Sequence, residues 1–158
     1  MTSAADTASI WHYAVRLWKR PGVTSAALVL QDRHGVSVCL ALAALWLADE
    51  DVTPDAGLAG MLVDTALDWE QQRIAPLRAL RRQASARADW ADWKRALQDA
   101  ELEAERLLLQ ELAAPLMQRP WPRGQGDRRA WLLLVLPEMA QCESLAKAVT
   151  TLLDACQE

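Results

Sequence analysis

Two glutamates stand on an otherwise apolar helical stripe in the second half of the chain. Glu101 and Glu105 are four residues apart and in line with Leu97, Leu108 and Leu112, so in a helix they share one face. Neighbouring carboxylates repel each other, so they require a cation or an arginine nearby. A magnesium or di-iron centre bound by both carboxylates is the more specific alternative to an arginine partner. Di-iron bundles use Glu-x-x-His pairs, however, and neither histidine has that spacing from a glutamate. We therefore predict arginine partners and no metal.

The arginines that could reach these glutamates belong to a basic block. Between Arg73 and Arg95 there are seven basic residues and two acidic ones, whereas residues 49–70 hold seven acidic residues and no basic one. This segregation permits ion pairs within the chain, a site for an anion or phosphate, or a patch for nucleic acid. Phosphate sites normally show a glycine-rich loop, and neither GxxxxGK(S/T) nor GxGxxG occurs. Ion pairing is favoured, with Arg78 and Arg81 as the natural donors to the glutamates.

A third polar feature interrupts the most apolar part of the chain. Residues 31–35, with the sequence QDRHG, lie between two aliphatic segments, and polar groups buried there need hydrogen-bond partners. A histidine beside an aspartate could form an acid/base pair. The favoured interpretation is structural, with these side chains capping and bracing a corner between two helices. Together the three features define the candidate polar cluster: Gln31, Asp32, His34, Arg78, Arg81, Glu101 and Glu105.

Helices must position these residues, and helical periodicity runs through most of the chain. Residues 36–48 are apolar on every side except for Ser37, which predicts a central helix surrounded by others. Pro76 predicts a kink or a restart in a later helix. Residues 118–127 contain two prolines and two glycines, which predicts a loop before a C-terminal helical segment. No strand-like alternation appears, so we predict an all-α fold: a single domain over residues 1–158, built as a multi-helix bundle around residues 36–48.

The tryptophans supply nearly all of the aromatic bulk, since the chain has eight of them, one tyrosine and no phenylalanine. Most should be core residues, but two fall in loop-like sequence and are expected at the surface. The last helix carries an amphipathic stripe that either closes the core or meets a partner helix. The candidate interface residues are Trp90, Trp121, Leu145, Val149 and Leu152.

Charge and cysteine content narrow the class of protein. A formal net charge of -4 argues against nucleic-acid binding through overall charge. The three cysteines, Cys39, Cys142 and Cys156, are widely spaced and form no CxxC pair, which is typical of reduced thiols in a cytosolic protein. The first residues lack a signal peptide's basic start and apolar core, and residues 36–48 are too short for the about 17 to 25 residues of a membrane span. We expect a cytoplasmic protein with no membrane association and no cofactor.

Several short motifs resemble a family of small proteobacterial proteins that share a domain of unknown function. The match extends from about residue 10 to residue 112. Its motifs are Trp11-x-Tyr13-Ala14, Pro21-Gly22-Val23, Leu30-Gln31-Asp32-x-x-Gly35, Pro76-Leu77-Arg78-x-x-Arg81 and Glu101-x-x-Ala104-Glu105. The resemblance implies an all-helical fold and no known activity. The family pattern has an acidic residue and an asparagine after the glycine where this chain has Ser37 and Cys39, so it does not extend a polar site into the central helix.

The sequence shows no catalytic signature: there is no GxSxG, and a thiol such as Cys39 in an apolar helix is inert. We predict a non-enzymatic helical module that binds a protein partner or a second copy of itself. One alternative is a small-ligand or enzymatic site at which Asp32, Arg78, Arg81, Glu101 and Glu105 converge. Another is a nucleic-acid accessory protein that uses the basic residues 78–95.

Overall fold

The computed structural model describes residues 4–136 and 142–157. Over these residues the chain is all-α, as predicted, and its only strand-like pairing is an isolated bridge between Val52 and Arg123. A π-helical segment, Glu70–Ile74, joins α4 to α5, and a 3-10 turn, Ala88–Trp90, precedes α6. The α-helices are α1 (Ala4–Trp18), α2 (Val23–His34), α3 (Val38–Asp49), α4 (Ala56–Trp69), α5 (Ala75–Ser85), α6 (Ala91–Gln118), α7 (Arg128–Val135) and α8 (Glu143–Ala155).

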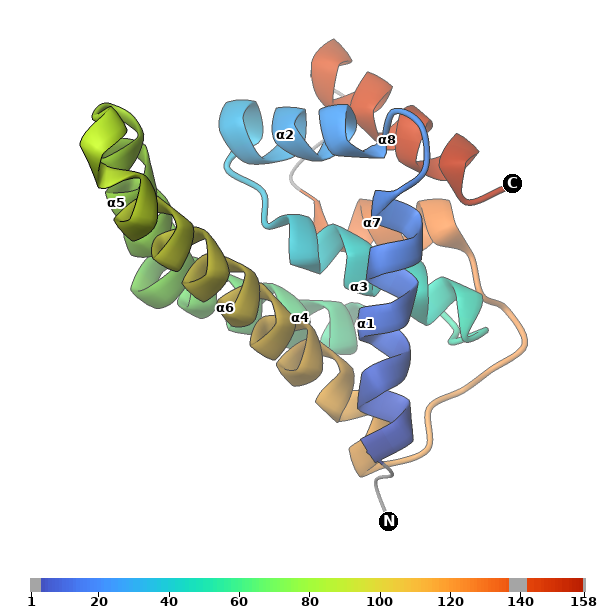
Figure 1. Cartoon of the computed structure of the whole chain (residues 1–158). Helices are drawn as coiled ribbons and strands as arrows, with labels where there is room; N and C mark the ends of the chain where they lie inside the picture. Colours follow the sequence, from blue (N-terminus) through green and yellow to red (C-terminus); the bar gives the residue numbers. More distant parts are fainter. Residues whose placement is uncertain (1–3, 137–141, 158) are drawn as a thin grey trace.

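Helix α3 is the centre of the fold, which confirms the prediction for residues 36–48. Every residue from Cys39 to Ala48 is buried, and α1, α2, α4, α6 and α7 all contact this helix. Figure 1 shows α3 in the middle of the molecule, with other helices around it. Ser37 provides its N-cap, since the hydroxyl accepts a hydrogen bond from the backbone N–H of Leu40 at 3.3 Å. A helix without a polar face is stable here because neighbours cover all of it.

Helix ends lie where glycine and proline predict them. Gly35 has a left-handed backbone (φ 61°), and its N–H and that of Val36 both donate to the carbonyl oxygen of Leu30. Backbone groups therefore close α2 at the corner, rather than the side chains of residues 31 and 32. Pro76 lies in the first turn of α5, directly after the π-helical segment. The break predicted at this proline is thus a restart of the helix.

Helices α5 and α6 form an antiparallel hairpin that extends from the body of the molecule (Figure 1). The first half of α6 packs on α5, and α6 also contacts α1 and α3. Consequently α6 connects the central helix with the hairpin. None of the described helices is both long enough and apolar enough to cross a membrane.

The C-terminal part covers two faces of the fold. Residues 119–127 form the predicted loop, after which α7 packs on α3 and α4, and α8 packs on α2. Trp121 was expected at the surface but is only 9% exposed, and of the two alternatives for the stripe of the last helix, the described residues show the one in which it closes the core. Trp121 folds back under Arg119 and donates from its indole N–H to the carbonyl oxygen of Pro115 at 2.9 Å. Leu145, Val149 and Leu152 are at most 2% exposed, because the stripe of α8 closes the core against α2.

Candidate functional site

A buried ion-pair network joins α6 to α5. Arg78 and Arg81 each donate from Nε to a different oxygen of Glu101, at 3.2 and 2.7 Å. Arg78 also donates from Nη1 to Glu70 at 2.7 Å. Arg78 and Glu101 are both 8% exposed. The predicted pairing of these arginines with a glutamate of the stripe is therefore found at Glu101.

The network favours the charged form of Arg78. Burial acts to lower the pKa of Arg78, but the hydrogen bonds and negative charges of Glu70 and Glu101 outweigh it, and the pKa rises above its ordinary value. Sequence reasoning missed Glu70, because it precedes Pro76 and the course of the chain across that break is not a regular helix. The sequence feature that could have identified Glu70 is its position as the last of the seven acidic residues in residues 49–70, shortly before the basic block begins at Arg73.

Glu105, one turn after Glu101, has a different environment. Its carboxylate makes no hydrogen bond or ion pair with any residue that the structure describes. Burial, followed by the negative charge of Glu101, raises its pKa from 4.5 to about 7. The two glutamates have equivalent positions on the helical stripe, but their environments differ. Both arginines bind Glu101, whereas Glu105 faces a pocket.

The corner residues divide between two places. Asp32 pairs with Arg82 at 3.4 Å, on the surface, and the two line a cleft of about 350 Å³ together with Gln31 and Arg78. His34 instead meets α8, where its Nε2 lies 2.9 Å from the hydroxyl of Ser144. The seven residues of the predicted polar cluster therefore do not form one site. Asp32 and Gln31 lie beside the network, whereas His34 belongs to the contact between α2 and α8.

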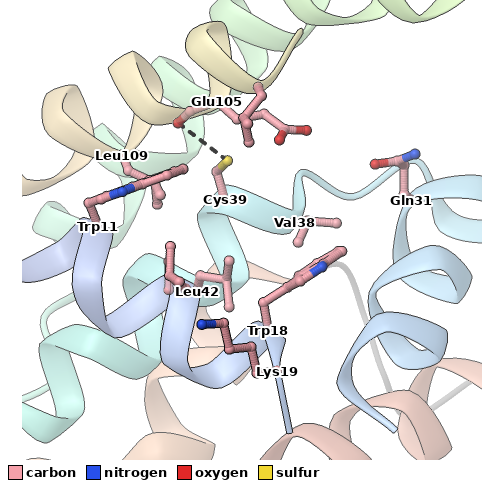
Figure 2. Close-up of a pocket in the computed structure, with 12 residues that line it drawn as sticks. Trp11, Trp18, Lys19, Gln31, Val38, Cys39, Leu42, Glu105 and Leu109 are labelled. Carbon is pink, nitrogen blue, oxygen red and sulfur yellow. Dashed lines mark hydrogen bonds between the residues drawn. The ribbon is translucent and has the colours of Figure 1, made fainter. Parts of the chain in front are cut away.

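The pocket that Glu105 faces lies between α1, α3 and α6, with the end of α2 at its edge (Figure 2). Its volume is about 360 Å³, within the range of small-ligand sites. Most of its wall is apolar, and the exposed side chains of Trp18 and Lys19 are part of its rim. The lining residues are Trp11, Ala14, Val15, Trp18, Lys19, Gln31, Val38, Cys39, Leu42, Leu102, Glu105 and Leu109.

Cys39 contributes a thiol to this pocket but not a nucleophile. Its Sγ donates to the backbone oxygen of Glu105 at 3.7 Å (Figure 2). Burial raises the pKa of this thiol well above its ordinary value. The reactive thiolate is thereby disfavoured. Among the described residues, no three His, Cys, Asp or Glu side chains are grouped so that they could hold a metal ion.

Comparison with known proteins identifies the family. Residues 9–112 match a family described as protein of unknown function (DUF2390). The chain belongs to this family. The DUF2390 segment runs from α1 into the last part of α6, so it contains both the ion-pair network and the pocket, whereas α7 and α8 lie outside it. The predicted resemblance to a family with a domain of unknown function, over about the same residues, is confirmed. No match was found among curated proteins or among solved structures.

Proposed function

We propose that this DUF2390 protein binds a small, largely apolar ligand in the pocket between α1, α3 and α6, without catalysing a reaction on it. One observation carries the proposal: an apolar pocket of about 360 Å³ contains a carboxylate, that of Glu105, without a partner among the described residues. Small-molecule sites combine apolar walls with a few placed polar groups. Here Glu105 and Gln31 are such groups, at the end of the pocket next to the network.

The ion-pair network supports this proposal as a scaffold. Arg78 and Arg81 fix Glu101, which lies one turn before Glu105 on the same helix. A binding group works best when its support is rigid and its neighbours are already paired. The network therefore orients Glu105 but does not compete for it. This modifies the predicted small-ligand site, since Glu105 and Gln31 face the ligand while Arg78, Arg81 and Glu101 lie behind them.

A pocket-filling variant tests the proposal. Val38 lies in the pocket wall (Figure 2), so Val38→Phe occupies space that a ligand would need. In ligand-observed NMR with a set of small aromatic amines, alcohols and acids, we expect saturable binding that Val38→Phe weakens by at least about tenfold. Leu134→Phe is the matched control, because Leu134 is 39% exposed on α7 and does not line the pocket. Binding that both variants leave unchanged would refute a site in this pocket.

A second candidate is protein binding at the tip of the hairpin, and it retains part of the predicted interface. Trp90 and Trp93 are 37% and 42% exposed. Their rings pack edge to face at 5.6 Å, with the guanidinium of Arg87 over Trp90. Lys94 and Arg95 follow on α6. Asp89 and Asp92 pair with Arg87 and Arg95, which leaves Lys94 as the basic residue here without an ion pair to a described residue. Tryptophan is enriched at interface centres, so we propose a partner segment with an apolar anchor next to one carboxylate.

Protein binding at the hairpin tip is tested by site-specific photo-crosslinking at position 91, between Trp90 and Trp93. Covalent capture of one protein at this position, lost in a Trp90→Ser/Trp93→Ser variant, is the expected result. The captured protein should carry an apolar segment with a carboxylate beside it, and a synthetic peptide of that segment should bind to the wild-type chain. A peptide that binds equally to the double variant would contradict the candidate.

The basic block gives little support to nucleic-acid binding, because carboxylates neutralise most of it. Beyond the network, four of its arginines lie in ion pairs: Arg73 with Asp68, Arg82 with Asp32, Arg87 with Asp89 and Arg95 with Asp92. A phosphate backbone binds through uncompensated positive charge.

The three cysteines are free thiols, which supports the cytoplasmic location that we propose.

A further inference from the structure

We propose that the ligand of this pocket is an organic cation, namely an amine with an apolar, preferably aromatic body whose ammonium group pairs with Glu105. This inference rests on the proposed function and adds the chemical class of the ligand. The other groups near Glu105, on each helix packed against it, decide the sign of the charge that the ligand must bring.

The charges behind Glu105 balance each other. Two carboxylates, Glu70 and Glu101, face two guanidinium groups, Arg78 and Arg81, and three hydrogen bonds of 2.7 to 3.2 Å join them. Their formal sum is zero, so the ionised Glu105 adds one negative charge that nothing in the network neutralises. A partly buried charge without a partner is unfavourable. A bound ammonium group would remove this penalty.

The other polar groups that line the pocket do not pair with the Glu105 carboxylate as a bound ammonium group would. Lys19, directly after the end of α1, lies at the opposite side of the pocket from Glu105 (Figure 2) and makes no ion pair with it. Cys39 on α3 uses its thiol for the backbone oxygen of Glu105. Gln31, from α2, is uncharged and can accept a hydrogen bond from an ammonium group. The place beside Glu105 is therefore open to a cation from solution.

The apolar part of the pocket fits the rest of such a ligand. Trp11 and Trp18 lie seven positions apart on α1, which puts both indoles on one face of the helix, toward the pocket (Figure 2). Aromatic rings attract organic cations and pack well against aromatic bodies. A volume of about 360 Å³ admits a single-ring or two-ring amine but not a long lipid.

The raised pKa of Glu105 gives the inference a signature in pH. An ammonium group pairs with the ionised carboxylate, whose pKa in the free protein is about 7. Affinity for an amine should therefore rise with pH and level off above 7. Between pH 8 and pH 5.5 we expect a loss of about 30-fold, the ratio of ionised fractions at these two values. A ligand that hydrogen-bonds to the protonated carboxyl would show the opposite trend.

The experiment compares three probes of nearly equal shape by isothermal titration calorimetry on the full chain: 2-phenylethylamine, 2-phenylethanol and 3-phenylpropionate. At pH 8 we expect the amine to bind at least about tenfold more tightly than the alcohol, and to lose this advantage at pH 5.5. In Glu105→Gln the amine should bind no better than the alcohol, at either pH. The pH series on the unmodified chain gives the same information without any variant.

The outcomes separate the two proposals. If the alcohol or the acid binds as tightly as the amine at pH 8, the cation assignment is wrong while ligand binding in the pocket stands. An affinity of the amine that does not change with pH, or that Glu105→Gln leaves intact, also overturns the assignment. If none of the three probes binds, and no member of the wider fragment set binds either, the proposed function fails together with the inference.

Discussion

Glu101 and Glu105 show which contacts of a site can be predicted from residue types and spacing. The i,i+4 pair on an apolar stripe predicts that basic partners must exist, and two arginines supply them at Glu101. Spacing gives no reason for the second glutamate to remain without a partner. That difference arises because both guanidinium groups come from α5 and reach the same turn of α6. The outcome depends on the crossing of two helices, which local sequence does not encode.

The free carboxylate should cost stability above neutral pH. The folded pKa of Glu105 is about 7 against an ordinary 4.5, so between these values the folded state binds more protons than the unfolded state. The free energy of unfolding therefore falls as pH rises from 4.5 to 7. We expect Glu105→Gln to be about 1 to 2 kcal/mol more stable than the wild type at pH 8, after allowance for partial exposure, and equally stable at pH 4.5. Urea unfolding at both pH values measures this, and an equal difference at both would contradict it.

At the scale of elements, the network acts as a clamp between α5, α6 and the π-helical segment. Arg78 and Glu101 have side chains only 10% and 11% exposed, so removing one charge leaves the other buried. We expect Arg78→Met to lower the free energy of unfolding by about 3 to 5 kcal/mol. Arg73→Met is the control, because the ion pair between Arg73 and Asp68 is exposed and should contribute less than about 1 kcal/mol. Similar losses in the two variants would show that the network is not a clamp.

The position of the loop after α6 depends on one close contact between its backbone and the end of α3. Gly126 lies against the end of α3, where an added Cβ would collide with the carbonyl oxygen of Ala48 and the Cα of Asp51. We expect Gly126→Ala to cost about 1 to 3 kcal/mol, since backbone atoms cannot give way as a flexible side chain would. Gly60→Ala is the matched control on α4, because its Cβ would meet open space and should stabilise that helix by about 0.5 to 1 kcal/mol. Thermal unfolding of the two variants should shift in opposite directions.

Helix ends were predictable because they depend on local chemistry. Gly35 and Pro76 act on their own backbone, so the corner and the restart of α5 follow from the sequence. The burial of Trp121 and of the stripe on α8 was not predictable in the same way. An amphipathic stripe looks the same whether it covers its own core or a partner. Only the position of α2, far away in the sequence, shows that the stripe is internal. The pocket likewise results from how α1, α3 and α6 cross.

For the whole molecule, the boundary of the DUF2390 match raises the question of what folds alone. The match ends at residue 112, yet α3 is covered in part by α7, and α2 by α8. Trp131 of α7 is fully buried and donates from its indole N–H to the carbonyl oxygen of Val52 at 2.8 Å. The family segment therefore packs against helices outside it, and one domain over the whole chain stays a prediction.

That prediction can be tested by cutting the chain. Residues 1–118 retain α1 to α6, but they lose the contacts that α7 makes with α3 and α4 and that α8 makes with α2. We expect this fragment to lose cooperative thermal unfolding and near-UV circular dichroism, and to be cut rapidly by protease, because exposing large apolar faces removes much of the driving force for folding. The full chain should unfold in one transition that coincides by far-UV circular dichroism and by tryptophan fluorescence. A fragment that unfolds cooperatively by itself, or two separated transitions in the full chain, would instead make α7 and α8 an independent unit.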